Sequence, residues 1–514
     1  MTVNKMKMKR QFFILLIYAL IIVSCSKSPG LIKPGVGKVF DDPEAPGFSS
    51  VTVHDPSVFL SGNNEFYVIG SHLAAGKTTD FIQWQQVTLD WNGRPNMFYP
   101  QDNPDPSVQK MQSQIDDVKR GARNILGFYA GDIHRMPDGK FYHYYCITSS
   151  WYCSAIGLAI AERIEGPYIT QGLIVRSGEA ADNSMTPDGI TGRWIMSQYP
   201  NCIDPQVFFD KNNENFYMVY GSWSGGIFIM DLDPGTGMLK PESAINMENG
   251  GYGRKLIRNS HSSIEGPYII YSPETQYYYL FVSYGGLAAN GGYNMRVFRS
   301  RSPEGPYEDA VHPNAGNELR NSEHHNYGVK IMGGYKFIYL EGERSRRSNG
   351  YLSPGHNSVY YDSDAGRYFL IYHQRFEGRG EFHEVRVHEM FLNKDGWFIA
   401  APFRHDGGTI RSFNRDSLSG TWKLINHGKE NNIIPVESQV FQFLRNGRIT
   451  GPNNSSGIWE LGSDNKTANI TLNGILYNGV FLRCYDENNN QWVQAFTALS
   501  QNGIALWGAG VAID

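Results

Sequence analysis

The 514-residue sequence predicts an all-β protein in which a five-bladed β-propeller is followed by a small antiparallel β-barrel or sandwich. The first observation behind this fold class is a strand–turn–strand pattern that recurs five times between residues 54 and 372. The second is that aromatic residues, which are enriched in β-strands, make up 13% of the chain. The third is a run of short alternating strands, joined by turns such as Asn-Gly, in residues 420–507.

Each copy of the repeat begins with a polar residue ahead of a short apolar strand and continues through a turn into an aromatic strand. The first copy runs from His54 to Val68 and the third from Ile203 to Tyr220. A third strand follows several copies, for example residues 156–161, so each interval can hold four short strands. Four-stranded units repeated five times are typical of a propeller, whereas a β-helix would show shorter and more regular repeats. We therefore assign residues 45–408 to the propeller.

The repeat aligns five lead residues, one per blade, spaced 61 to 91 residues apart. Because the first strand of each blade lines the central channel, these residues are expected to converge on one axial funnel. Like charges raise each other's pKa values, so a cluster of acids is costly to assemble unless it has a use. The lead residues are Asp55, Asp132, Asp204, Glu265 and His356.

The tetrapeptide Glu-Gly-Pro-Tyr occurs three times and so cannot by itself identify a catalytic acid. Glu165 and Glu304 follow a third strand, at the outer part of a blade, where a shared turn explains the motif. Only Glu265 precedes an inner strand. Glycoside hydrolysis needs one protonated and one ionised carboxyl group. Asp55 and Asp204, which share an Asp-Pro frame, join Glu265 as the catalytic candidates.

The first 25 residues are interpreted as a bacterial lipoprotein signal peptide. Basic residues precede an apolar run over residues 12–23, which is too short for a comfortable membrane span. The run ends at Ser24-Cys25, so we expect lipid on the Cys25 sulfur and an outer-membrane lipoprotein at the cell surface or on the periplasmic face. An ordinary signal peptide with an incidental cysteine, or an uncleaved anchor, are the alternatives. Residues 26–44 are expected to form a tether.

Composition excludes one class of partner and leaves the state of the cysteines open. The net charge is −4 and charged residues are few, which argues against nucleic acid because its binding needs a basic face. The lipid anchor is the one membrane contact that the sequence predicts. An exported compartment permits a disulfide, and Cys146 with Cys153 is the nearest pair, but buried free thiols fit equally well.

Residues 409–514 are assigned to the C-terminal barrel or sandwich. The expected strands include residues 439–444, 457–461, 468–472 and 479–485, with Asn446-Gly447 and Asn473-Gly474 as turns between them.

Three segments, taken in order, resemble the catalytic boxes of glycoside hydrolase family 43. They are His54-Asp55-Pro56-Ser57, Ile203-Asp204-Pro205-Gln206-Val207 and Ser263-Ile264-Glu265-Gly266-Pro267-Tyr268. The resemblance implies a five-bladed propeller that inverts the anomeric centre. By it, Asp55 would be the general base, Glu265 the general acid, and Asp204 the residue that raises the pKa of the acid and holds it in place. An inverting pair is expected to lie roughly 6.5–9.5 Å apart.

Two further segments point to the substrate. Residues 385–388 with Asp395-Gly396-Trp397 resemble the last blade of endo-acting arabinanases, and Gly420-Thr421-Trp422 with residues 503–508 resemble the extra barrel domain found on some of them. The resemblance implies cleavage of internal α-1,5-L-arabinofuranosidic bonds in arabinan or arabino-oligosaccharides. The alternatives are an exo-acting α-L-arabinofuranosidase or β-xylosidase on the same propeller, and a non-catalytic carbohydrate-binding lipoprotein.

His356 resembles the axial histidine of arabinanases, which binds a calcium ion whose other ligands are largely water. A lone histidine would not by itself predict calcium, which prefers oxygen ligands, so a hydrogen-bonded channel histidine is the alternative. The remaining substrate-binding candidates lie near strand ends or in the loops that follow, apart from the ring residue Asp132. They are Asp132, Trp151, Tyr199, Trp223 and Tyr284.

Overall fold

The computed structural model describes residues 42–88 except 63, residue 106, and residues 127–150, 153–178, 194–408 and 411–511. Cys25 and Trp151 lie outside the described residues, as does most of the tether. Within these ranges, no helix combines the length and the apolar character needed to cross a membrane.

Five sheets, antiparallel except for one parallel strand pair in the fifth, form the propeller and confirm the predicted fold class. Blade 1 comprises β1 (Ser57–Leu60), β2 (Phe66–Ile69), β3 (Ala75–Thr78) and β4 (Gln85–Thr88). Blade 2 comprises β5 (Gly127–Arg135), β6 (Phe141–Ser150), β7 (Cys153–Ala161) and β8 (Ile169–Arg176). Blade 3 comprises β9 (Gln206–Phe209), β10 (Phe216–Tyr220), β11 (Ser224–Leu232) and β12 (Arg254–His261). Blade 4 comprises β13 (Ile264–Ser272), β14 (Tyr277–Tyr284), β15 (Asn294–Ser300) and β16 (Val329–Met332).

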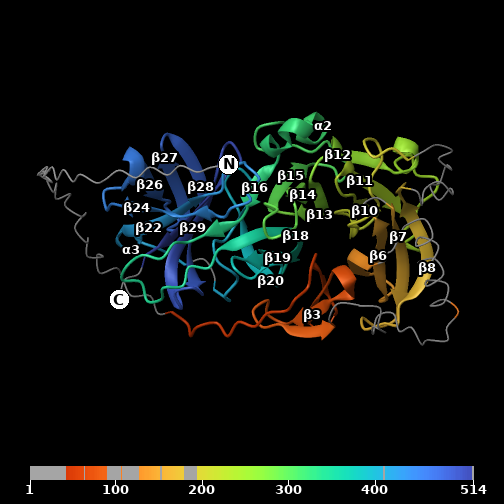
Figure 1. The fold of residues 1–514 in the computed structure, drawn as a ribbon, viewed down its shortest axis with the longest axis horizontal. Helices are drawn as coiled ribbons and strands as arrows, with labels where there is room; N and C mark the ends of the chain where they lie inside the picture. The colour runs from red at the N-terminus through yellow and green to blue at the C-terminus, as the bar shows by residue number, and fades with distance from the viewer. Residues whose placement is uncertain are drawn as a thin grey trace, which may run out of the picture.

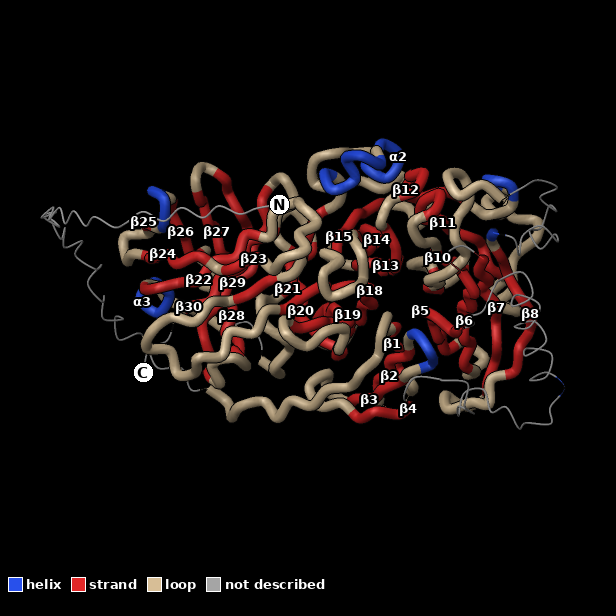
Figure 2. Tube along the Cα trace, in the orientation of Figure 1, coloured by secondary structure: helices blue, strands red, loops and turns tan. Residues whose placement is uncertain are grey.

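The fifth blade has two strands more than the others. It comprises β18 (Tyr351–Asp362), β19 (Arg367–Phe376), β20 (His383–Leu392) and β21 (Phe398–Ala400), extended by β17 (Tyr335–Lys336) and β23 (Val436–Glu437). Helix is confined among the described residues to short segments, including α2 (Ala315–Glu318) and α3 (Arg415–Leu418) (Figure 2).

The aromatic strands supply the packing between neighbouring blades. Tyr279 of β14 lies edge-on to Phe398 of β21, with ring centroids 4.6 Å apart, and Tyr368 of β19 lies 4.8 Å from the same ring. His134 of β5 and Phe216 of β10 make a similar contact between blades 2 and 3 at 5.7 Å. Rings at these separations bury large apolar areas, so the aromatic residues of β10 and β14 help to join one sheet to the next.

The C-terminal domain is a closed barrel of eight antiparallel strands, so of the two predicted forms the barrel is confirmed. Its strands are β22 (Gly420–Asn426), β24 (Gln439–Phe443), β25 (Arg448–Thr450), β26 (Ser456–Leu461), β27 (Thr467–Leu472), β28 (Ile475–Asp486), β29 (Gln491–Ser500) and β30 (Ala505–Gly510). Figure 1 shows the blue barrel strands at one end of the molecule and β6, β7 and β8 at the other. Strands β1 to β21 precede residue 408 and β22 to β30 follow it, but β23 pairs in the fifth sheet and not in the barrel.

The four cysteines of the described chain are buried and form no disulfide with one another. The β6–β7 register places Cys146 opposite Ile156 and Cys153 opposite Ser150. The Cys146–Cys153 disulfide therefore does not form in this structure, and the alternative of buried thiols holds.

A buried ion cluster joins the barrel to blade 5. The carboxylate of Glu487 lies 2.9 Å from Arg386 and 3.3 Å from Arg404, and it accepts a hydrogen bond from the Tyr351 hydroxyl at 2.6 Å. Burial alone would raise the pKa of Glu487, but the two arginines and Tyr351 lower it to about 2.

We expect Glu487→Gln to lower the free energy of unfolding by about 2 kcal/mol at pH 7, because the buried arginines lose their counter-charge. The folded pKa of about 2 lies below the ordinary 4.5, so the contribution is complete above pH 4.5 and is lost as the pH falls through 2. Urea unfolding at pH 7 and at pH 3 should show the gap between wild type and variant shrinking. Glu437→Gln, which removes an exposed carboxylate 3.7 Å from Lys336, is the control and should change stability by less than about 0.5 kcal/mol.

Candidate active site

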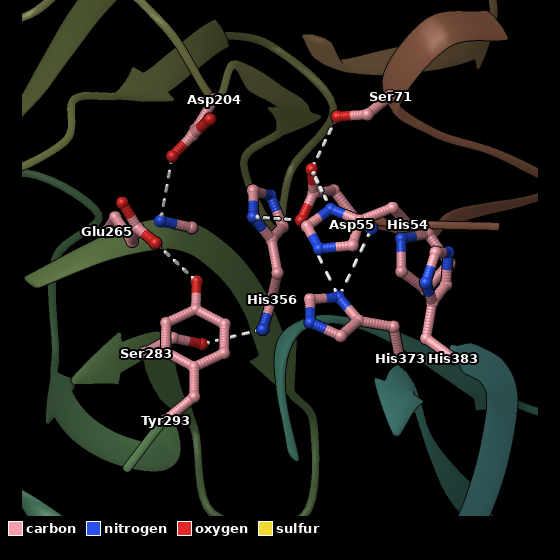
Figure 3. A network of polar contacts seen from close by, with 12 residues as sticks. His54, Asp55, Ser71, Asp204, Glu265, Ser283, Tyr293, His356, His373 and His383 are labelled. Carbon is pink, nitrogen blue, oxygen red and sulfur yellow. Dashed lines mark hydrogen bonds and ion pairs between the residues drawn. The ribbon is translucent and has the colours of Figure 1, made fainter. Parts of the chain in front are cut away.

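Three of the five lead residues occupy a left-handed backbone conformation at the start of, or within, an inner strand. The φ angles are 56° at Asp55, 57° at Asp204 and 48° at His356. This region costs a residue with a side chain on the order of 1 kcal/mol, and such residues cluster at functional sites. Figure 3 shows the result, with His356 lying between Asp55 on one side and Asp204 and Glu265 on the other.

Asp55 is held by groups from blades 1 and 5. Its Oδ2 atom accepts a hydrogen bond from the Ser71 hydroxyl at 2.5 Å and lies 2.7 Å from Nδ1 of His54. Its Oδ1 atom lies 3.0 Å from Nδ1 of His356, and its backbone amide donates to Nδ1 of His373 at 3.3 Å. Both carboxyl oxygens of this buried side chain are therefore fixed in direction by their polar partners.

Opposite shifts in pKa separate Asp55 from its partner His356. Burial alone would raise the pKa of Asp55, but His356 and His54 hold it well below its usual range. Burial alone would lower the pKa of His356, but Asp55, Asp204 and Glu265 raise it to about 9. At neutral pH this arrangement pairs an ionised Asp55 with a positively charged imidazole.

Glu265 accepts three hydrogen bonds from neutral donors. The Ser222 hydroxyl donates to Oε2 at 2.8 Å, and the indole N–H of Trp223 donates to the same atom at 2.9 Å. The Tyr293 hydroxyl donates to Oε1 at 2.8 Å. These donors come from the β10–β11 turn and from the segment before β15, so blades 3 and 4 together fix the carboxyl group.

Asp204 is linked to Glu265 through the backbone. The amide of Gly266 donates to Oδ2 of Asp204 at 3.2 Å. Gly266 has a φ of 59°, and a Cβ there would lie 3.1 Å from the His356 ring, so glycine permits this close approach. Burial raises the pKa of Asp204 to about 8, and the charges of Glu265 and Asp55 act in the same direction against the opposing effect of His356. Asp204 therefore keeps a proton at neutral pH, and the two neighbouring carboxyl groups do not both carry charge.

Asp132, the lead residue of blade 2, links its blade to the blades on either side. It accepts hydrogen bonds from the Ser57 hydroxyl in blade 1 and from the Val207 amide in blade 3, the latter at 2.8 Å. Burial raises its pKa to about 6. Both oxygens are thus engaged within the protein, and no described contact joins Asp132 to the network around Asp55.

The predicted sugar-contact residues separate in the structure. Trp223 contacts Glu265 directly, as described above. Tyr199 is half-buried and packs against Tyr252, with ring centroids 5.3 Å apart. Tyr284 is fully buried, with the Arg296 guanidinium 4.5 Å above its ring, so it offers no face to a sugar, contrary to the expectation for this residue.

Sequence reasoning missed several polar residues of the network. Ser71, Ser222 and Tyr293 donate to the catalytic candidates from segments between strands that have no fixed place in the repeat. His373 lies in the aromatic strand β19, where its ring stacks on that of His54 at 4.0 Å. The His-Asp pair at positions 54 and 55 was the one available signal, since both residues belong to the first box. Glu165 and Glu304, by contrast, lie in the turns after β7 and β15, as predicted for a shared blade turn.

Comparison with known proteins gives a family match over nearly the whole described chain. Residues 47–398 match the model described as glycosyl hydrolases family 43, and residues 402–508 match a C-terminal lipocalin-like domain. An extracellular endo-α-(1→5)-L-arabinanase 2 of Bacillus subtilis (strain 168) is 43% identical over 476 residues, covering 91% of this chain and 94% of the relative. An extracellular endo-α-(1→5)-L-arabinanase of Thermotoga petrophila is 39% identical, covering 91% of this chain and 95% of the relative. The crystal structure of the endo-1,5-α-L-arabinanase from Thermotoga petrophila superimposes with a TM-score of 0.80 at 37% identity, covering 91% of this chain and 100% of that one.

Proposed function

Because the chain belongs to glycosyl hydrolase family 43, and is thus a glycoside hydrolase, we propose that it cleaves internal α-1,5-L-arabinofuranosidic bonds of arabinan with inversion. In this proposal Asp55 is the general base, Glu265 the general acid and Asp204 the residue that holds a proton beside the acid. The two relatives that align with this chain over more than nine-tenths of their own length, from Bacillus subtilis and Thermotoga petrophila, are endo-arabinanases. This similarity supports arabinan as the substrate.

The single observation that carries the assignment of roles is the opposite electrostatic environment of Asp55 and Asp204. Asp55 is stabilised as an anion by His356 and His54, which suits a group that must take a proton from water. The pKa of Asp204 is raised to about 8, so at neutral pH its carboxyl group is protonated and places no negative charge beside Glu265. A general acid must hold a proton until the departing sugar oxygen takes it, and in this proposal the proton that the Asp204–Glu265 pair retains is the one that Glu265 delivers.

Product sizing with linear and branched arabinan tests the substrate and the mode of attack. A ladder of oligosaccharides at early times is expected, and proton NMR of the first products should give the anomer opposite to that of the substrate. Release of arabinose alone would favour the exo-acting arabinofuranosidase. Release from xylan instead would favour the xylosidase, and binding without release from any of these polymers would favour the carbohydrate-binding protein.

The calcium ion remains a proposal, with His356 as the residue that would hold it. The carboxyl groups around His356 suit a cation, and the imidazole would hold the ion in its neutral form, giving up the proton that it carries in the absence of metal. Calcium takes oxygen ligands, so water would complete the coordination. When bound, the ion would supply a fixed positive charge on the propeller axis.

Thorough EDTA treatment is expected to lower both the melting temperature and the activity, and added Ca²⁺ is expected to restore both. Loss of the ion removes positive charge from among the acids, so they repel each other more strongly. Differential scanning calorimetry measures the first effect without any substrate. An unchanged melting temperature together with unchanged activity after chelation would contradict the proposal that the protein binds a calcium ion.

Anchoring through Cys25 to the bacterial outer membrane also remains a proposal, based on the sequence of the first 25 residues. Labelled palmitate is expected to enter the wild-type protein, and Cys25→Ser is expected to abolish labelling and release the protein from the membrane fraction. Protease treatment of intact cells then distinguishes the cell surface from the periplasmic face. A labelled Cys25→Ser variant would contradict the assignment.

A further inference from the structure

One loop of the barrel domain packs against blade 4, and we name residues His427–Asn432, between β22 and β23, the barrel loop. Two buried basic side chains of the propeller, Lys330 and Arg296, hold the barrel loop. Lys330 Nζ donates to the carbonyl oxygens of His427 at 2.9 Å and Glu430 at 2.6 Å. Arg296 is fully buried and donates through Nη2 to the carbonyl oxygen of Lys429 and to Oδ1 of Asn431, the latter at 3.1 Å. Burial lowers the pKa of Lys330 to about 7, whereas Arg296 stays charged at neutral pH and makes the stronger hydrogen bonds, so the loop is fixed where it enters the propeller.

One route of contacts leads from the barrel loop to Glu265 through Tyr293. Asn431 Oδ1 accepts a hydrogen bond from Asn294 Nδ2 at 3.0 Å. On the other side of Tyr293, a Cβ at Gly292 would lie 3.0 Å from the carbonyl oxygens of Asn431 and Asn432, so the loop packs directly on that backbone. Tyr293 is 1% exposed, and its hydroxyl donates to Glu265 Oε1 at 2.8 Å. Both neighbours of Tyr293 are therefore set by the barrel.

A second route approaches Glu265 from the other direction through His324. Nδ1 of His324 lies 2.9 Å from the carbonyl oxygen of Asn321, which can only accept, so Nδ1 carries the proton and Nε2 is an acceptor. Nε2 lies 3.3 Å from Asn431 Nδ2 and 3.5 Å from the Ser263 hydroxyl, which are its two donors. Ser263 stands two residues before Glu265. The single side chain of Asn431 thus joins both flanks of the glutamate.

We propose that Asn431 is a positioning residue for catalysis, through which the barrel domain sets the Tyr293 hydroxyl against Glu265. The inference rests on the proposed function, because it gives Glu265 the role of general acid. The barrel is then part of the catalytic apparatus although no barrel residue in this chain of contacts touches Glu265. Supporting hydrogen bonds of this kind hold a catalytic group in place to within fractions of an ångström. Small displacements of such a group lower the reaction rate by large factors.

The kinetic test compares Asn431→Ala with a matched control on the same domain interface. Asn431→Ala is expected to lower kcat on linear arabinan about tenfold, with KM nearly unchanged and the pH profile of kcat displaced. Asn489→Ala removes a different interdomain asparagine, whose Nδ2 donates to Glu343 Oε1 at 3.1 Å, and is expected to leave kcat and the pH profile as in wild type. Asn431→Asp retains the acceptor for Asn294 and Arg296 and should recover most of kcat, which separates the Tyr293 route from the His324 route. Equal losses in the two alanine variants, or an unmoved pH profile in Asn431→Ala, would overturn the proposal.

A double-mutant cycle and a substrate-free measurement complete the test. If Asn431 acts through Tyr293, the losses of Asn431→Ala and Tyr293→Phe are not multiplicative, and the double variant resembles Tyr293→Phe alone. A crystal structure of Asn431→Ala should show the Tyr293 hydroxyl beyond hydrogen-bond distance of Glu265. Multiplicative losses, or a hydroxyl still 2.8 Å from Glu265 Oε1, would each overturn the positioning role. A displaced hydroxyl in a protein whose wild type releases nothing from arabinan would contradict the proposed function instead, and would leave the positioning role supported.

Discussion

Glu265→Gln is expected to lower kcat on linear arabinan by about a thousandfold, while the circular dichroism spectrum and the melting temperature stay near those of wild type. Glutamine has the size of glutamate, its amide oxygen can still accept the hydrogen bonds from Ser222 and Trp223, and its NH2 group can donate to the Tyr293 hydroxyl oxygen. It cannot transfer a proton to the departing sugar oxygen. The loss should therefore appear in catalysis and not in folding.

The leaving group distinguishes a lost acid from a damaged site. An aryl arabino-oligosaccharide with a nitrophenolate leaving group needs little protonation, so Glu265→Gln should retain far more of its activity on that substrate than on arabinan. Glu165→Gln, at another copy of Glu-Gly-Pro-Tyr, is the matched control and should behave as wild type on both substrates. Near-normal hydrolysis of arabinan by Glu265→Gln would mean that another residue is the acid.

Asp55→Asn is expected to lower kcat about a thousandfold on arabinan and on the aryl substrate alike, because activation of water is needed whatever group departs. Asparagine tolerates the left-handed backbone that the structure requires at position 55, where φ is 56°. Equal losses of kcat on arabinan and on the aryl substrate, measured side by side, would identify Asp55 as the general base.

Asp210→Asn provides the comparison for this second variant. Asp210 accepts hydrogen bonds from the Glu214 and Asn215 amides in the turn between β9 and β10. It is expected to weaken that turn and leave kcat unchanged. If Asp55→Asn lost arabinan hydrolysis but kept the aryl activity, the roles of Asp55 and Glu265 would have to be exchanged.

The periodic part of the site could be predicted from the sequence, because propeller blades repeat both strand order and lead position. The repeat brought Asp55, Asp204, Glu265 and His356 to one axis and distinguished Glu265 from Glu165. It could not find Tyr293 or Asn431, since these residues lie in loops whose courses depend on contacts between distant segments. Hydrogen bonds between residues more than a hundred positions apart, such as Asn294 to Asn431, leave no local pattern.

The roles of single aromatic and acidic residues could not be predicted from the repeat, because a residue's position at the end of a strand does not reveal which way its side chain faces. Tyr284 ends β14 and yet lies under Arg296 in the core. Asp132 occupies a lead position like Asp55, but its oxygens are used by Ser57 and the Val207 amide of a neighbouring blade. A repeat predicts where a residue sits along the axis, whereas hydrogen-bond partners decide its role.

The strand β23, which the C-terminal domain contributes to the fifth sheet, bears on how this chain can be divided. Val436 and Glu437 pair in parallel with Tyr335 and Lys336, and the buried Glu343 of the propeller finds its counter-ion in Lys423 of β22, at 2.6 Å. A truncation before β22 would leave an open sheet edge and an unpaired buried anion. The two halves are thus not interchangeable modules, and scanning calorimetry of the intact protein is expected to give one cooperative transition instead of two. Recombination between relatives should accordingly exchange the whole 47–508 unit and not one half of it.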